Sequence, residues 1–239
     1  MIPSLPPSTG PIGVFDSGYG GLTILDKIRG LMPEYDYIYL GDSARCPYGP
    51  RSFEVVYEFT LQAVSKLFEL GCPLVILACN TASAKALRTI QQINLPVIDA
   101  TRRVLGVIRP TAECIGEITR SRHVGILATA GTIKSESYLL EIHKLSPDIV
   151  VTGEACPMWV SLVENNEYQS EGADYFVKQH INRLLDKDPM IDTIILGCTH
   201  YPLLLDKIRQ FTPGHIRIIA QGEYVARSLQ DLSLIHISE

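Results

Sequence analysis

The stretch LACNTASAK, residues 77–85, places a cysteine, an asparagine and a threonine directly after an apolar run. The chain repeats this arrangement in IILGCTHYPLL, residues 194–204, where a second cysteine follows a second apolar run. Short runs rich in Ile, Leu and Val are typical of strands that are buried on both faces. Such strands occur in parallel sheets that are covered by helices, so the two stretches predict an α/β protein.

Further apolar runs alternate with amphipathic stretches of helical length along the chain. We expect strands at residues 12–15, 37–40, 74–78, 97–99, 123–127, 149–152, 193–196 and 216–219. We expect helices between them, at residues 53–70, 82–92, 135–144, 171–185 and 203–210. The pattern predicts mostly parallel sheets flanked by helices, with ligands bound at the carboxyl ends of the strands.

An internal repeat divides the chain into two related halves. PIGVFDSGYGGLTIL (11–25) and HVGILATAGTIKSESY (123–138) both run from a strand through a small polar turn into a helix. VILACNTAS (75–83) and IILGCTHYP (194–202) form a second matching pair. We therefore expect two pseudo-symmetric α/β domains with the active site at their interface.

The join between the two expected domains lies near IDATRRV, residues 98–104. The first domain is expected to hold residues 12–101 and 215–232, and the second to hold residues 102–214. Residues 1–11 are expected to form a disordered leader. SLIHISE, residues 233–239, is expected to be an atypical and foreign tail, because it breaks the helical pattern of residues 223–232.

Composition and charge exclude several classes of protein. The 239 residues are 46% hydrophobic and 20% charged, which is typical of a globular protein. A net charge of -5 without a basic cluster argues against a nucleic-acid partner. No apolar run approaches the ~20 residues of a membrane span, so we expect no membrane contact. Six cysteines without an export signal or a C-x-x-C pair predict free thiols in a reducing cytoplasm.

Two polar segments other than the cysteine stretches are candidates for a site. DSGYGG, residues 16–21, could be a phosphate-binding turn, but it lacks both the G-x-G-x-x-G pattern and a P-loop lysine. A tight turn before a helix, capped by Asp16 or Ser17, explains the same residues. GDSARCPYG, residues 41–49, has the composition of a surface loop unless the fold places it over a site.

The two cysteines, Cys79 and Cys198, follow matching strands. A lone buried cysteine is most often an inert core thiol, but two at equivalent strand ends favour a function. The polar groups beside them suit a small carboxylate or amino acid as ligand; they come from Asn80, Thr81, Ser83 and Thr199. His200 could be structural, or it could lower the pKa of the neighbouring thiol and relay its proton.

The residues alone leave two chemistries open. Two opposed thiols could act as base and acid on opposite faces of one carbon. A single thiol paired with His200 could instead be a nucleophile for acyl or C–N hydrolysis. A zinc site built on Cys198 and His200 is disfavoured, because the usual paired ligand spacing is missing.

Six motifs, in this order, resemble those of glutamate racemases, in the cofactor-independent aspartate/glutamate racemase superfamily. They are VFDSGYGGLTIL (14–25), YLGDSARCPYG (39–49), ACNTAS (78–83), LATAGTIKSESY (127–138), ACPMWVSLVE (155–164) and LGCTHYPLL (196–204), and the resemblance spans residues 12–227. It implies an isomerase, an amino-acid racemase, that interconverts L-glutamate and D-glutamate by two bases. It further implies no cofactor and no metal, D-glutamate supply for peptidoglycan in a bacterial cytoplasm, and a homodimer.

The resemblance also assigns roles to individual residues. Cys79 matches the thiol that faces the D-isomer, with Asp16 as its acidic partner. Cys198 matches the thiol that faces the L-isomer, with His200 as its partner. Two further acidic positions are matched by Asp42 and Glu164. The positions that hold the substrate are matched by Ser17, Pro47, Tyr48, Gly49, Asn80, Thr81, Thr129, Thr132 and Thr199.

The sequence departs from the family pattern in one internal segment, and rival functions remain. AQGEYVA, residues 220–226, stands where many members carry an Asp-Ser-Gly segment, so the first domain could close differently. The alternatives are an aspartate or hydantoin racemase of the same superfamily and a non-catalytic glutamate-binding protein. His200 argues against the aspartate enzymes, which tend to carry a glutamate there, and the retained pair of cysteines argues against a binding protein.

Overall fold

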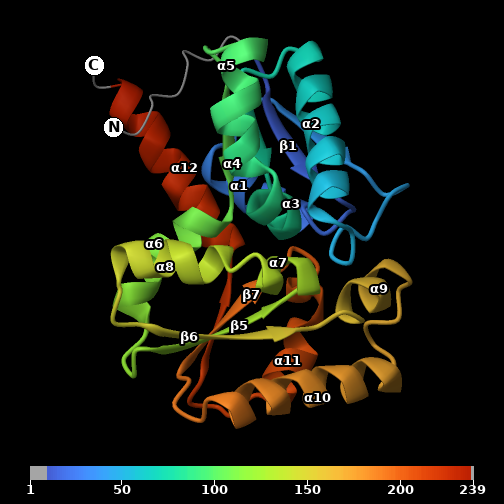
Figure 1. Cartoon of the computed structure of the whole chain (residues 1–239), viewed down its shortest axis with the longest axis vertical. Coiled ribbons are helices and arrows are strands. Elements are labelled where there is room, and N and C mark those ends of the chain that lie inside the picture. Colours follow the sequence, from blue (N-terminus) through green and yellow to red (C-terminus); the bar gives the residue numbers. More distant parts are fainter. Residues whose placement is uncertain (1–9, 238–239) are drawn as a thin grey trace.

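The protein, described here by a computed structural model, forms two four-stranded sheets that lie one above the other in Figure 1. The structure describes residues 10–237, with side chains up to residue 232. Every pair of neighbouring strands is parallel, and helices flank both sheets. These observations confirm the predicted α/β class with two pseudo-symmetric halves.

The first sheet has the strand order β2-β1-β3-β4. Its strands are β1 (Ile12–Asp16), β2 (Tyr37–Gly41), β3 (Leu74–Leu77) and β4 (Arg103–Gly106). The helical elements of this half are α1 (Leu22–Leu31), α2 (Phe53–Glu69), α3 (Asn80–Lys85), α4 (Leu87–Thr89), the π-helical turn η1 (Ile90–Asn94) and α5 (Leu95–Ile98). Alternate side chains of β3 point to opposite faces, so Val75 packs against α2 while Ile76 packs against α1.

The second sheet has the equivalent order β6-β5-β7-β8. Its strands are β5 (His123–Ala128), β6 (Val150–Ala155), β7 (Thr193–Gly197) and β8 (Arg217–Ala220). Its helical elements are α6 (Ile108–Ile118), α7 (Ala130–Lys134), α8 (Ser137–Leu145), α9 (Trp159–Glu164), α10 (Glu171–Lys187), the 3-10 turn η2 (Tyr201–Leu204) and α11 (Leu205–Phe211). Ile194 packs toward α10, and Ile195 packs toward α6 and α8.

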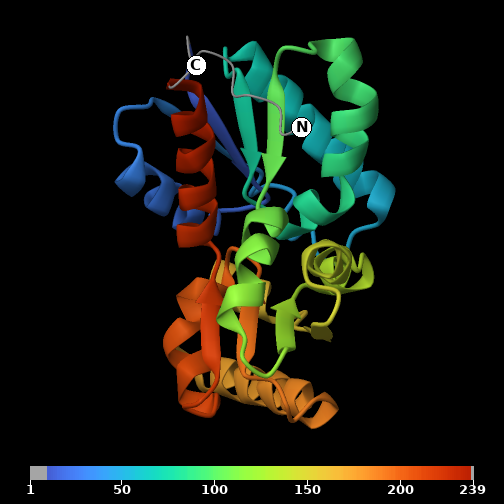
Figure 2. The ribbon, with the colours of Figure 1, turned by 90° about the vertical axis from the view of Figure 1, so that its left-hand side faces the viewer.

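Over the part of the chain that the structure describes, it crosses twice between the halves. The first crossing lies between Val107, in the core of the first half, and Ile108, in the core of the second. The return runs from β8 through Gln221 into α12 (Gly222–Ile237), whose side chains Val225 and Leu229 pack beside α1. Figure 2 shows α6 leading down from β4 and α12 rising beside the first sheet.

Two of the predicted elements differ from the structure. Residues 97–99 do not form a strand: α5 ends at Ile98, and the Val97 side chain is 85% exposed. The edge strand is β4, residues 103–106, which pairs with β3. Residues 97–99 and 103–106 are both short and carry β-branched residues. The local sequence pattern therefore could not show which of the two segments pairs with β3. The helix predicted at residues 82–92 is divided among α3, α4 and η1.

The expected domain boundaries need two corrections. β4 belongs to the first sheet, although it lies beyond the expected boundary at residue 102. β8 belongs to the second sheet, although residues 215–232 were assigned to the first domain. Within residues 10–237, only α12 returns to the first half. The predicted break in the helical pattern after residue 232 is also wrong, because α12 continues to Ile237. The rest of the predicted tail, and residues 1–9 of the predicted leader, lie outside the described residues.

Across residues 10–237, none of the helices combines the length and the apolar character that crossing a bilayer requires.

Asp192 fixes the start of the central strand β7. Its carboxylate accepts hydrogen bonds from the backbone N–H groups of Arg120 and Ser121, each at 2.7 Å, and from the hydroxyls of Thr119 and Thr193. Burial by itself would raise the pKa of Asp192, but these four hydrogen bonds outweigh burial and hold that pKa far below its usual range.

We expect Asp192→Asn to lower the free energy of unfolding by about 2–3 kcal/mol near neutral pH, because hydrogen bonds to a charged acceptor are lost. Since the folded-state pKa lies below the unfolded value of ~3.9, the stabilisation is present above that value and is lost as pH falls toward the folded-state pKa. Urea unfolding at about pH 7 and about pH 3 measures both effects.

Asp186→Asn, at an exposed position near the end of α10, is the matched control and should change stability by less than about 0.5 kcal/mol. A stability difference between the wild type and Asp192→Asn that is as large at low pH as at neutral pH would contradict this role.

Candidate active site

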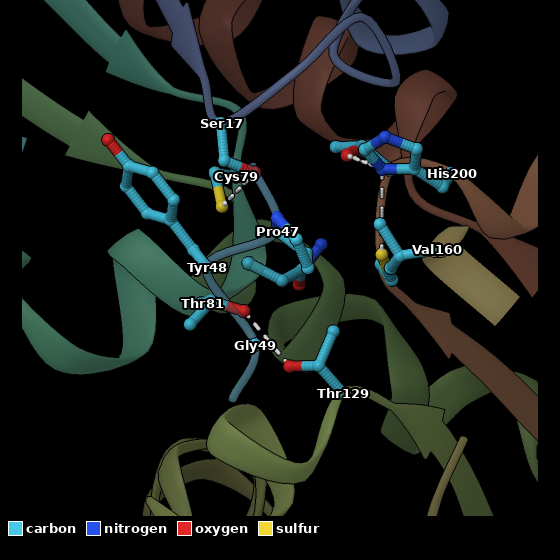
Figure 3. A pocket seen from close by; sticks show the side chains of 12 residues that line it. Ser17, Pro47, Tyr48, Gly49, Cys79, Thr81, Thr129, Val160 and His200 are labelled. Carbon is cyan, nitrogen blue, oxygen red and sulfur yellow. Dashed lines mark hydrogen bonds between the residues drawn. The ribbon is translucent and has the colours of Figure 1, made fainter. Parts of the chain in front are cut away.

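A small cavity lies where the carboxyl ends of the two sheets face each other (Figure 3). Residues from both halves line it: Ser17, Pro47, Tyr48, Gly49, Cys79, Asn80, Thr81, Thr129, Val160, Cys198, Thr199 and His200. Every predicted site residue lines this cavity except Asp16, Thr132, Asp42, Glu164 and Ser83. The first four each contact a residue that lines it. The Ser83 hydroxyl was expected to suit a ligand, but it donates to the Leu77 carbonyl and accepts from the Val107 N–H. Val160 was not predicted, because an apolar side chain in a helix carries no chemical signal in the sequence.

The DSGYGG segment is a close-contact turn between β1 and α1. Gly21 is the N-cap of α1, and no side chain caps this helix. The expectation that Asp16 or Ser17 caps it is therefore wrong. The Asp16 carboxylate instead accepts a hydrogen bond from the Gly18 N–H at 3.0 Å. A Cβ atom on Gly20 would lie 2.5 Å from His200 Nδ1. Glycine is therefore required there because the two halves meet at this turn.

Cys79 follows β3, which ends at Leu77, and is the N-cap of α3. Its thiol donates a hydrogen bond to Ser17 Oγ at 3.4 Å. Burial, together with the negative charge of nearby Asp16, raises the pKa of the Cys79 thiol to about 12, although Ser17 and the Ala82 N–H act in the opposite direction. Cys79 is therefore a protonated thiol near neutral pH.

Cys198 directly follows β7, the strand of the second sheet that is equivalent to β3. Its Sγ lies 3.9 Å from His200 Nδ1, and His200 Nε2 lies 2.5 Å from Glu164 Oε1. Burial alone would lower the pKa of the His200 imidazole, but its hydrogen bonds to Cys198 and Glu164 outweigh burial and raise it to about 10. Burial alone would raise the pKa of the Glu164 carboxyl, but its hydrogen bond to His200 and the positive charge of His200 lower it. Cys198 thus faces an imidazolium.

Figure 3 shows that the surroundings of the two thiols differ: Ser17 lies beside Cys79 on one side of the pocket, and His200 lies on the other. Asp16 links the two sides. The Thr199 hydroxyl donates to Asp16 Oδ1 at 3.1 Å, and the negative charge of Asp16 raises the pKa of the Cys79 thiol. The arrangement is therefore symmetric in backbone and asymmetric in charge.

Three threonine hydroxyls connect the halves below the thiols. Thr81 of α3 lies 2.9 Å from Thr129 and 3.4 Å from Thr132, which belong to the start of α7. Thr129 is the N-cap of α7, and its hydroxyl accepts a hydrogen bond from the Thr132 N–H. These hydroxyls can donate to or accept from a small polar ligand in the cavity.

The GDSARCPYG segment reaches over the cavity and is not an ordinary surface loop. Its residues Pro47 and Gly49 line the cavity, and the buried Tyr48 hydroxyl donates to Asp42 Oδ2 at 2.5 Å. Arg45 also contacts Asp42 Oδ2, at 2.6 Å. Asp42 therefore holds the loop closed and makes no contact with the cavity itself.

One group in the described part of the chain could hold a metal ion: Cys46, Glu164 and His200, whose ligand atoms lie within 4.8 Å of one another. Zinc bonds of ~2.0–2.1 Å at tetrahedral angles separate two ligand atoms by about 3.3 Å. The 2.5 Å contact between His200 Nε2 and Glu164 Oε1 is too short for a cation between them. The arrangement fits a hydrogen-bonded ion pair better than a metal site.

The cavity has a volume of about 10 Å³, which is room for a single water-sized molecule. A second cavity of about 160 Å³ adjoins it and shares Pro47 and Val160 with it. The structure therefore describes a closed form of the site, and a larger ligand requires the walls to separate.

Comparison with known proteins agrees with this arrangement. A family profile described as Asp/Glu/Hydantoin racemase matches residues 23–229. The chain is 39% identical to the glutamate racemase of Shouchella clausii over 227 residues, which cover 95% of this chain and 79% of that protein.

Solved structures of glutamate racemases are similar as well. A glutamate racemase isoform from Bacillus anthracis superposes with a TM-score of 0.87 at 37% identity, covering 96% of this chain and 83% of the other. The Francisella tularensis glutamate racemase in complex with D-glutamate gives a TM-score of 0.83 at 33% identity, covering 95% and 82%. The resemblance predicted from the six motifs is confirmed.

The closeness of Gly20 to His200 gives a test of the closed geometry. Gly20→Ala should lower the free energy of unfolding by about 1–3 kcal/mol, because the added methyl group overlaps the buried imidazole. Gly30→Ala is the matched control: a Cβ there meets nothing within 4 Å, and the helical site should gain about 0.5–1 kcal/mol. Urea unfolding of both variants measures the difference, and equal effects would contradict the geometry.

Proposed function

The chain belongs to the Asp/Glu/Hydantoin racemase family, and we propose that it interconverts L-glutamate and D-glutamate without a cofactor. One observation carries the proposal: two thiols that follow equivalent strands of the two sheets line the same small cavity. A binding protein has no need of two thiols, and a hydrolase needs only one. The D-glutamate complex of the Francisella tularensis protein supports the choice of substrate.

Racemisation needs a proton acceptor on one face of the α-carbon and a proton donor on the other. In the L-to-D direction, the Cys198 thiolate removes the α-proton and becomes a thiol. The Cys79 thiol delivers its proton to the opposite face and becomes a thiolate. Proton exchange with solvent, in which Cys198 loses a proton and Cys79 gains one, then restores the starting state for a further turnover, and the D-to-L direction uses the same two states in reverse. In the D-to-L direction Cys79 is the base, and burial disfavours its thiolate and makes it correspondingly more basic, which suits a weakly acidic α-proton.

The surroundings of the thiols support these starting states. The imidazolium of His200 stabilises a negative charge on Cys198, and Glu164 holds the imidazole in place. The neighbourhood of Asp16 favours the protonated form of Cys79. One thiol and one thiolate are the combination that a two-base reaction requires.

The remaining cavity residues are proposed to bind the substrate. Amide, hydroxyl and backbone donors would hold its carboxylates and stabilise the carbanion that forms when the α-proton leaves. We assign this role to Ser17, Pro47, Tyr48, Gly49, Asn80, Thr81, Thr129 and Thr199, with Thr132 supporting the threonine cluster. Glutamate is far larger than a water molecule, so we propose that the halves move apart to admit it.

We infer that the protein supplies D-glutamate for peptidoglycan synthesis in a bacterial cytoplasm. We also infer that it acts as a homodimer. The family membership supports the biological role. Release of tritium from α-labelled glutamate into water distinguishes a racemase from a glutamate-binding protein, which leaves the α-proton in place. Parallel assays with aspartate and hydantoins test the other members of the family.

Replacing either active-site thiol should abolish racemisation while leaving one half-reaction. Cys79→Ser and Cys198→Ser should each lose several powers of ten in rate, since an alcohol is a far poorer base than a thiolate, at ~1.4 kcal/mol per tenfold. With a glutamate analogue that carries a β-leaving group, elimination needs only one deprotonation. Cys79→Ser should keep elimination from the L-like isomer, and Cys198→Ser from the D-like one.

Cys114→Ser, in the half-buried surface of α6, is the control and should keep normal turnover. Near-normal racemisation by either active-site variant would rule out the two-base mechanism. A covalent adduct on one cysteine, with the other dispensable, would instead indicate a hydrolase.

The reaction should not depend on a bound cofactor. The purified protein is expected to be colourless and to keep its activity after treatment with a chelator, because the two thiols supply both proton transfers. Absorbance spectra and assays before and after chelation measure this. A visible Schiff-base band, or activity that is lost on chelation and restored by metal, would contradict it.

A further inference from the structure

Three buried polar side chains form a closed ring behind the cavity. Asn80 Nδ2 donates to Gln221 Oε1 at 2.7 Å, Gln221 Nε2 donates to the Tyr138 hydroxyl at 2.6 Å, and that hydroxyl donates to Asn80 Oδ1 at 2.7 Å. All three side chains are at most 3% exposed. Only Asn80 lines the cavity, so the other two act on it from behind.

The ring lies where the chain crosses between the halves. One hydrogen of Gln221 Nε2 points to Tyr138, and the other is shared between the Val107 carbonyl at 3.1 Å and Thr111 Oγ1 at 3.2 Å. Val107 is the last residue before the first crossing, and Gln221 is the residue between β8 and α12 on the return. The two crossings therefore contact each other through one glutamine side chain.

The Val107 carbonyl determines the direction of every hydrogen bond in the ring. A carbonyl can only accept, so the NH2 end of Gln221 must face Val107 and its oxygen must face Asn80. Asn80 then has to present its NH2 group to Gln221 and its oxygen to Tyr138. Because the Tyr138 hydroxyl has a single hydrogen, it accepts from Gln221 and donates to Asn80.

We propose that Gln221 is a positioning residue that fixes the orientation of the Asn80 amide toward the substrate. One hydrogen of Asn80 Nδ2 binds Gln221, and the other makes no hydrogen bond to the described residues, so it is available to an acceptor in the cavity. With glutamate as substrate, as in the proposed function, that acceptor is a carboxylate oxygen. A flipped amide would turn its own oxygen toward this anion and weaken binding.

The experiment compares Gln221→Met with Thr111→Val. Methionine matches the length of glutamine but removes both hydrogen-bonding ends, so Asn80 becomes free to flip. The Val107 carbonyl keeps a donor in that variant, the Thr111 hydroxyl at 3.2 Å. Thr111 is as buried as Gln221 and contacts the same carbonyl, but it does not determine the orientation of Asn80.

For Gln221→Met we expect KM for glutamate to rise about tenfold or more in both directions, with a smaller change in kcat, because ground-state binding is weakened. Thr111→Val should keep a KM within about twofold of the wild type. Tyr138→Phe removes the donor to the Asn80 oxygen and should raise KM like Gln221→Met, which keeps the test valid if one variant folds poorly. A purely structural defect would lower the amount of active enzyme and leave KM unchanged.

A double-mutant cycle with Asn80→Ala identifies the route of the effect. If Gln221 acts through Asn80, Gln221→Met should add little to KM once Asn80 is alanine. An unchanged KM in Gln221→Met, or an equal further rise in the Asn80→Ala background, would overturn the inference. A wild-type protein that does not turn over glutamate would contradict the proposed function instead, and ligand binding to the same variants would then replace turnover.

Discussion

Parallel pairing of β3 with β1, and of β7 with β5, is the constraint on which the rest of the molecule depends. Parallel strands end at the same edge of a sheet, so the residues after them gather there. Because both sheets have the same strand order, the two edges present equivalent loops to each other. Cys79 and Cys198 reach one cavity for this reason, although they are far apart in the sequence.

The backbone symmetry is combined with an asymmetric charge distribution. The Cys198 side carries the His200–Glu164 pair, and the Cys79 side carries Asp16, which is fully buried. A buried charge is stable only where hydrogen bonds or an opposite charge compensate for lost hydration. For Asp16 the compensating groups come from both halves: the Gly18 N–H of its own half and the Thr199 hydroxyl of the other donate to it. Closing the halves therefore completes the hydrogen bonds of Asp16 as well as the cavity.

The hydrogen-bonded ring behind the cavity gives the two crossings of the chain a chemical connection to the site. The Val107 carbonyl orients Gln221, and Gln221 orients Asn80. Any motion that separates the halves must rearrange this ring, because Tyr138 belongs to one half and Asn80 to the other. The contacts that hold the closed form are thus shared with those that orient a cavity residue.

The sequence by itself determined the α/β class, most strands, the family and the segments that form the site, because apolar runs and contiguous motifs are local signals. It did not determine which short run becomes an edge strand, so residues 97–99 were assigned wrongly in place of β4. It also misplaced β8, since sheet membership depends on pairing with β7. Val160 gave no signal, and Gln221 drew notice only within the unusual segment 220–226. Only the tertiary structure places Val160 in the cavity and Gln221 behind it, because the partners of both side chains are distant in sequence.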